Sequence, residues 1–389
     1  MDASRLGAAV VLLLGVFGTA ALGEDGVSPN KIVFGQVAAL TGPAQDLGQG
    51  MRQGVVAAFE DANRMGAIAG RTLELKSLDD GYEPEKTVAA TKQIIEVDKV
   101  FAMIGAVGTP TSKAGQPIAT DAKVPFIGPF TGAEFLRNPY NRYVVNVRAS
   151  YFEETEAWIE HLTGDLGITR IAILYQDDAF GLAGLEGVQR ALTKRNMSLV
   201  SAGSFKRNTT AVKTALLDIM RGNPEAVVTV APYKPVAQFI KLAHFLKLNP
   251  VFVAISFVGS DSLAQELGGD GAGVIVSQVV PFPADTSLPV VASYQSALAA
   301  LDRGAKPGYV SLEGYLVGRL AVEALRRVQG EPTHEKFLDA IEAVPFDLGG
   351  VVLSYGPTRN QGSDQVFFTI LQGDGSFKPV ARLAKMAAQ

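Results

Sequence analysis

The sequence contains no cysteine, which excludes disulfide bonds, thiol nucleophiles and metal sites with cysteine ligands. It has only three histidines, His161, His244 and His334, and these lie far apart within predicted helices. Charged residues make up 19% and the formal net charge is −4, so the basic surface that binds nucleic acid is missing. The G-x-S-x-G motif of hydrolases and the glycine-rich nucleotide-binding motifs are missing too. These absences favour a protein without metal or cofactor that binds a molecule rather than transforming it.

Long hydrophobic runs are also scarce, and only Ala8–Ala21 stands out. Arg5 precedes this run, Ala21 ends it and Gly23 follows, which places small residues at the positions that signal peptidases require. The run is short for a membrane span. We therefore expect a secretory signal peptide over residues 1–23 and a periplasmic protein, with an uncleaved anchor as the alternative.

The rest of the chain alternates predicted strands and helices in two successive sets, which is typical of α/β folds with parallel sheets. At 389 residues the chain is long enough for two domains. Strands are predicted at 31–38, 73–78, 101–105 and 124–127, and again at 170–175, 198–205, 226–230, 251–255 and 274–279. Three helices (288–303, 310–328, 334–343) and three strands (351–354, 366–371, 377–383) follow. The expected fold is two doubly wound lobes with a ligand cleft between them.

Two loops of small and hydroxyl-bearing residues organise the first set. They are Gly108–Ser112 (GTPTS) and Gly128–Gly132 (GPFTG), and each follows a predicted strand. Adjacent parallel strands place such loops side by side at their carboxyl ends, where α/β sheets bind ligands. Glycine permits close approach of the backbone, and hydroxyls with free N–H groups suit a polar or anionic oxygen.

Two carboxylate pairs also follow strands, Asp79-Asp80 and Asp177-Asp178. Such pairs can serve acid–base catalysis or metal binding, but carboxylates at this position more often cap the next helix. We expect caps here.

Taken together, several segments resemble the periplasmic solute-binding proteins of ABC importers, in the branch of leucine/isoleucine/valine-binding proteins. They are LTGPAQDLGQG (40–50), LDDGYEPEKTV (78–88), IGAVGTPTS (104–112), GPFTGAEFL (128–136), RIAILYQDDAFG (170–181) and EGYLVGRLAVEAL (313–325). The resemblance implies a monomeric receptor with two lobes and three crossovers, which closes on a small molecule and delivers it to a membrane permease.

The crossovers are expected near Val147–Ser150, Ser277–Phe282 and Val344–Gly350. This divides the chain into a first lobe (31–147 and 280–346) and a second lobe (151–277 and 350–389).

The resemblance also implies site residues. In amino-acid binders the first-lobe loops hold the ligand carboxylate, which points to Thr109 with Thr111 and to Thr131 or Gly132. Aromatic walls are expected from Phe180 and Tyr233, and Leu47 and Phe130 complete an apolar cleft. Where the family usually places a carboxylate for the ligand ammonium, this chain has Ser256 followed by Phe257.

Serine supplies no charge, so the expected ligand is a hydrophobic or amphiphilic carboxylate, amide or neutral molecule rather than a free α-amino acid. A branched-chain amino-acid binder stays open, since Asp177, Asp178 or Glu134 could replace the missing carboxylate. Two further alternatives are the sensing module of a regulator and a secreted hydrolase or lyase that uses Asp177 or Asp178.

Overall fold

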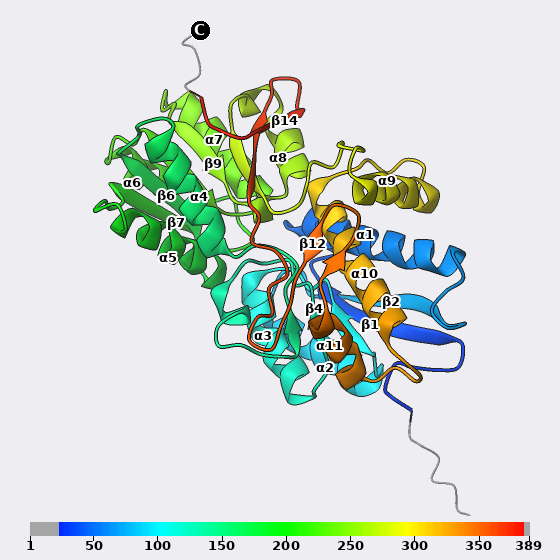
Figure 1. Ribbon diagram of the computed structural model, residues 1–389. Helices are drawn as coiled ribbons and strands as arrows, with labels where there is room; N and C mark the ends of the chain where they lie inside the picture. Colours follow the sequence, from blue (N-terminus) through cyan, green and yellow to red (C-terminus); the bar gives the residue numbers. More distant parts are fainter. Residues whose placement is uncertain (1–22, 385–389) are drawn as a thin grey trace, which may run out of the picture.

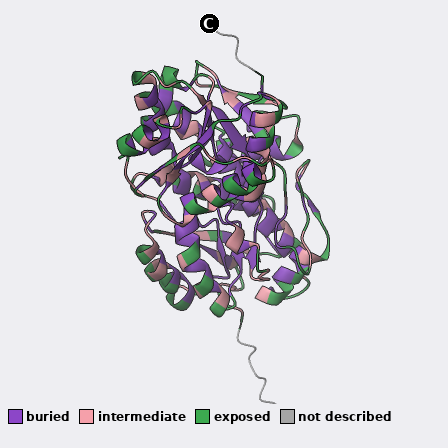
Figure 2. Ribbon diagram, turned by 90° about the vertical axis from the view of Figure 1, so that its left-hand side faces the viewer, coloured by how far each residue is buried: buried purple, intermediate pink, exposed green. Residues whose placement is uncertain are grey.

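The computed structural model describes residues 23–384, which form two lobes stacked one above the other (Figure 1). Figure 2 shows buried residues on the strands and on the inward sides of the helices, with exposed residues on the outer helical surfaces. Among the described residues, no helix is long and apolar enough to cross a membrane. The expected signal segment lies outside the described residues, apart from Gly23.

The first lobe contains a parallel sheet in the order β2-β1-β3-β4-β5. Its strands are β1 (Lys31–Ala38), β2 (Thr72–Asp79), β3 (Ala102–Ile104), β4 (Phe126–Ile127) and β5 (Val144–Val145). Its helices are α1 (Gln45–Arg64), α2 (Pro84–Lys92), α3 (Thr109–Asp121), α9 (Pro289–Leu301), α10 (Tyr309–Arg327) and α11 (His334–Ala343), with a small hairpin of β11 (Phe346–Asp347) and β12 (Val352–Leu353).

The second lobe contains a sheet in the order β14-β13-β10-β9-β8-β6-β7, parallel except for the antiparallel pairs that β13 makes. Its strands are β6 (Ile171–Gln176), β7 (Ser201–Phe205), β8 (Ala226–Val230), β9 (Val251–Ala254), β10 (Ile275–Gln278), β13 (Phe367–Leu371) and β14 (Phe377–Val380). Its helices are α4 (Tyr151–Gly164), α5 (Ala179–Thr193), α6 (Lys213–Met220), α7 (Tyr233–Phe245) and α8 (Ser260–Leu267).

Sequence patterns explain where individual strands lie. β8 (AVVTV) is buried at every position, because both faces of a central parallel strand are covered by helices. β2 (TLELKSLD) mixes apolar with polar residues and lies at the edge of its sheet. The expected α/β fold with two parallel-sheet lobes is confirmed.

Helices α1 and α10 pack so closely that small residues are required at their contact. A Cβ atom added at Gly54 would lie 2.0 Å from the backbone oxygen of Ser311, and one at Gly314 would lie 2.4 Å from that of Met51. Any larger side chain would push the helices apart. This contact fixes the position of α1 relative to α10 within the first lobe.

Three chain crossings join the lobes, and the third lies later than expected. Asn146 donates its backbone N–H to Asn360 O (2.7 Å) and accepts from the N–H of Gly362 (2.8 Å). Asn360 and Gly362 are therefore hydrogen-bonded to the end of the first lobe, and the chain crosses between Gly362 and β13 rather than at Val344–Gly350. The sequence pattern could not show this, because the short β11–β12 hairpin resembles a return into the second sheet.

Candidate ligand-binding site between the lobes

The two threonine-containing loops meet at the carboxyl ends of β3 and β4, which are parallel neighbours. Thr109 begins α3 and Thr131 follows β4, and their hydroxyl oxygens lie 2.6 Å apart. Thr131 also donates to the Tyr151 hydroxyl over 3.3 Å. Both threonines are buried. The structure therefore joins three hydroxyls from both lobes into one polar group.

The other first-lobe residues expected at the site have local roles. The hydroxyl of Thr111 donates to Gly108 O (3.0 Å) and so closes the first turn of α3. Gly132 accepts the backbone N–H of Tyr151 (2.7 Å), and a Cβ atom there would lie 2.6 Å from the Tyr151 ring. Gly132 thus permits close approach of the two lobes.

An aromatic cluster fills the space beside the threonines. Phe257 is central, with ring centroids at 4.6 Å from Phe180, 5.2 Å from Phe130 and 6.1 Å from Tyr82. Phe180 also lies 5.6 Å from Tyr151. Phe130 and Tyr82 belong to the first lobe and the other rings to the second, so the lobes are in contact here. All these rings are buried.

Leu47 and Tyr233 lie together at the edge of this cluster, beside Gly259. The Leu47 side chain is 2.5 Å, and the Tyr233 ring 3.6 Å, from the position that a Cβ on Gly259 would occupy. Gly259 has a φ of +78°, a backbone conformation that glycine adopts without strain. Leu47 comes from the first lobe and Tyr233 from the second, so this contact also spans the cleft.

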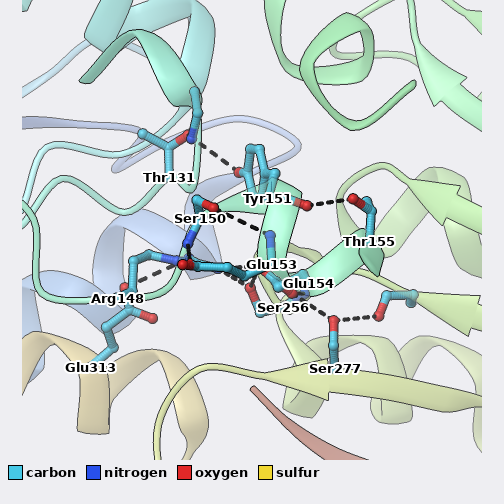
Figure 3. A network of polar contacts seen from close by, with 12 residues as sticks. Thr131, Arg148, Ser150, Tyr151, Glu153, Glu154, Thr155, Ser256, Ser277 and Glu313 are labelled. Atoms are coloured by element: carbon cyan, nitrogen blue, oxygen red, sulfur yellow. Dashed lines mark hydrogen bonds and ion pairs between the residues drawn. The ribbon is translucent and has the colours of Figure 1, made fainter. Parts of the chain in front are cut away.

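Ser256 stands in front of a carboxylate that the sequence does not place there, Glu154 on α4. Glu154 accepts from the backbone N–H and the hydroxyl of Ser256 (3.0 and 2.8 Å) and from the Ser277 hydroxyl (2.6 Å). It also forms an ion pair of 2.9 Å with Arg148, which in turn donates to the Ser256 hydroxyl (Figure 3). Both oxygens of Glu154 thus accept hydrogen bonds, and the guanidinium of Arg148 balances the negative charge.

Arg148 lies between this carboxylate and Glu313 on α10. Its guanidinium carbon lies 5.2 Å from the centroid of the Phe130 ring and 5.8 Å from that of Tyr151. Its Nη1 is 3.6 Å from Glu313 Oε1. Burial opposes the charge of Arg148, but Glu313 and Glu154 outweigh this and hold its pKa above the ordinary value. Burial also raises the pKa of Glu313 to about 7, although Arg148 acts against the rise.

Of the four carboxylates in the pairs after strands, only Asp178 caps the following helix, because α2, which follows Asp79 and Asp80, has no side-chain cap. Asp79 accepts from the backbone N–H groups of Leu40 and Thr41 (2.8 and 3.1 Å), and Asp178 caps α5 by accepting from Phe180 N–H (2.9 Å). Asp80 is buried, and burial raises its pKa to about 6.

Sequence reasoning missed several residues of this site, namely Tyr82, Arg148, Tyr151, Glu154 and Glu313. Tyr82 carries the clearest signal, since it follows a strand end, but only the structure shows its φ of +63°. A bulky residue in this region is strained, and such strain often marks functional sites. In the sequence, the capping-box pair of Ser150 and Glu153 predicts where α4 begins and hence that Tyr151 is its first residue. No local pattern links Arg148 to Glu313.

Two lobes that meet across buried polar and aromatic residues and are joined by three crossings define a two-lobed ligand-binding protein. The family model described as "Periplasmic binding protein" matches residues 31–376, and the chain belongs to this family. It is therefore a substrate-binding protein of the ABC transporter type, and the family is extracytoplasmic.

Solved structures and a curated relative agree with this assignment. A possible leucine/isoleucine/valine-binding protein from Rhodopirellula baltica is 37% identical, with a TM-score of 0.87 over 93% of this chain and 98% of that one. A substrate-binding periplasmic protein from Ralstonia solanacearum is 26% identical, with a TM-score of 0.85 over 90% and 100%. The leucine-specific-binding protein of Salmonella typhimurium is 22% identical over 79% of this chain and 83% of its own.

Proposed function

We propose that this protein is the receptor of an ABC importer that closes on a small hydrophobic or amphiphilic molecule without an ammonium group and hands it to a membrane permease. The observation that carries this proposal is that both carboxylate oxygens of Glu154 are already hydrogen-bonded. This carboxylate lies behind Ser256, but its oxygens already accept from Ser256, Ser277 and Arg148. An ammonium buried here would find no free oxygen on Glu154, and burying an unpaired charge is strongly unfavourable.

The remaining cleft residues suit an apolar ligand with one polar end. The rings of Phe130, Phe180 and Phe257 provide apolar walls, and each Å² of apolar surface removed from water contributes about 25 cal/mol. The hydroxyls of Thr109 and Thr131 provide donors for a ligand oxygen. Because the rings touch one another in this structure, a ligand has to separate the lobes before it can lie between them.

A receptor for branched-chain amino acids is the second candidate, favoured by the names of the relatives. It requires Glu154 to leave Arg148, or another carboxylate, such as Glu313 beside Arg148, to accept the ammonium. Asp178 does not provide one, since it is paired with Arg207 at 3.1 Å. The same pairing removes the reason to assign a hydrolase or lyase to Asp178, and Asp177 is exposed to solvent.

A thermal-shift panel tests the proposal. Leucine, valine and phenylalanine are compared with their deaminated acids (isocaproate, isovalerate and hydrocinnamate) and with the matching amides. We expect a deaminated acid or amide to stabilise the protein more than its amino acid. Stabilisation by the amino acids alone would contradict the proposal and favour the second candidate. Native mass spectrometry of protein from its own host should show a carried small molecule.

A further inference from the structure

Arg148 is buried, yet its hydrogen bonding is incomplete. Only 1% of its side chain is exposed, and Nη2 donates to Glu154 and to Ser256. Within the described chain, Nε and Nη1 have no hydrogen-bond acceptor. Buried polar groups are nearly always paired, so unpaired donors on a buried cation mark a place where an acceptor binds.

The neighbour of Nη1 is Glu313, and the contact between them is loose. The two atoms lie 3.6 Å apart, beyond hydrogen-bond distance, and the Glu313 carboxylate accepts no other hydrogen bond from residues 23–384. Glu313 is 3% exposed. A carboxylate held in this way is an easily replaced partner for Arg148.

Arg148 also borders the part of the cleft that a ligand would occupy. Its guanidinium lies over the ring of Phe130, the residue next to Thr131, and close to Tyr151, whose hydroxyl accepts from Thr131. Figure 3 shows Arg148 between Glu313 and the start of α4. Arg148 and the threonine hydroxyls therefore border the same part of the contact between the lobes, beside Phe130 and Tyr151.

Building on the receptor function proposed above, we infer that the ligand is a carboxylate whose oxygen replaces Glu313 as the partner of Arg148, while Glu313 takes up a proton from solvent. The charges that act on Glu313 are those of Arg148, Arg137 and Glu154. With Glu313 ionised, these four side chains sum to zero. An added carboxylate would leave one net negative charge in a buried cluster, and the proton on Glu313 restores the balance.

The pKa of Glu313 determines the pH range in which ligand binding is coupled to proton uptake. Burial raises the pKa of Glu313 to about 7 while Arg148 is its neighbour, and loss of Arg148 to a ligand would raise it further. Near and above neutral pH, binding therefore requires proton uptake. Affinity for a carboxylate should fall as pH rises above about 7, approaching tenfold per pH unit, because one proton is bound with each ligand.

The test uses isocaproate and hydrocinnamate with their amides, titrated by calorimetry from about pH 6 to about pH 8.5. We expect the acids to bind the wild type more weakly as the pH rises and the amides to show no such trend. Glu313→Gln keeps the shape without a titrating group, so acid affinity should become independent of pH. Asp80→Asn is the matched control, since Asp80 also has a raised pKa but lies outside the Arg148 cluster.

Calorimetry of the wild type in buffers of different ionisation enthalpy counts the protons directly and does not depend on any variant folding. Uptake approaching one proton per acid at about pH 8 is expected. Any of three results would overturn the inference: no proton uptake, a pH dependence of acid affinity that persists in Glu313→Gln, or no binding of either acid at any pH. Binding of amides without acids would overturn it while leaving the receptor function intact, whereas amino acids alone would contradict both.

Discussion

At the scale of single residues, the sequence could predict that the hydroxyls of Thr109 and Thr131 lie near each other. Both follow strands that are neighbours in the sheet, and strands that are consecutive in an alternating pattern are usually neighbours. The cluster of Arg148, Glu154 and Glu313 could not be predicted. These residues come from a crossing, a second-lobe helix and a first-lobe helix, and only the assembled fold brings them together.

Thr109→Val tests the hydroxyl pair. Valine keeps the shape of threonine but removes the oxygen that lies 2.6 Å from Thr131. A ligand oxygen that accepts from this group would lose its partner in a buried site, so affinity should fall by about 1–3 kcal/mol.

Calorimetry with the best-bound compound of the panel measures the change. Thr229→Val is the control, because Thr229 is a buried threonine whose hydroxyl donates to Val253 O (3.1 Å) within the second sheet. Equal affinity of wild type and Thr109→Val would remove Thr109 from the site.

At the scale of elements, residues of one lobe cap the beginning of a helix in the other lobe. Helix α10 begins after Gly308, which has no side chain to cap it. The cap comes from the other lobe, where Asp261 on α8 accepts the backbone N–H of Tyr309 (3.1 Å). Next to it, Ser262 donates to Asp46 in the first turn of α1 (2.8 Å). A carboxylate near a helix N-terminus is stabilising, so this contact favours closure.

The opposite rim carries a second set of contacts, made by the loop after β7. Arg207 forms an ion pair with Glu83 of the first lobe (2.8 Å) and with Asp178 of its own lobe (3.1 Å). Asn208 donates to Glu83 (2.7 Å) and to Gly81 O (3.1 Å). The loop after β7 therefore connects the second lobe to Gly81 and Glu83, the residues just before α2 in the first lobe.

Arg207→Ala should shift the protein toward the open form. Glu83 is partly exposed, so the loss in closure free energy should be about 1 kcal/mol, roughly a fivefold change in the open-to-closed ratio. Since the chain has no cysteine, spin labels can be attached cleanly at Glu85→Cys and Lys213→Cys, two exposed positions on α2 and α6.

Pulsed electron paramagnetic resonance then reports the distance between the lobes. Arg221→Ala is the control, because Arg221 follows α6, is 80% exposed and, among residues 23–384, pairs only with Asp218 on that helix. A distance distribution in Arg207→Ala identical to that of the wild type would show that the rim contact has no part in closure.

At the scale of the whole molecule, the sequence predicts the two lobes but not the path between them. Alternating strands and helices identify both sheets, because each buried strand must be covered by helices on its faces. The third crossing was expected too early, since a two-residue strand such as β12 has too few residues to show which sheet it joins. Helix α8 was not expected either, and its residues supply the cap of α10.

The arrangement of the crossings leads to the last prediction. The first and third crossings run side by side and are joined by the hydrogen bonds of Asn146 with Asn360 and Gly362. Such a paired segment resists sliding of one lobe over the other, so motion should be a rotation about this hinge. Because the rings of Phe130 and Phe257 now touch, ligand entry requires the rotated, open form.

Small-angle scattering should therefore show a larger radius of gyration for the ligand-free protein than for the closed structure described here. Addition of the most stabilising compound of the panel should reduce the radius to that of the closed structure. Asn146→Asp retains the backbone hydrogen bonds but removes the side-chain N–H groups that donate to Leu136 O (2.9 Å), so it perturbs the hinge without touching the cleft. We expect this variant to close less completely at the same ligand saturation. A radius that stays constant from ligand-free to saturated wild-type protein would contradict hinge closure.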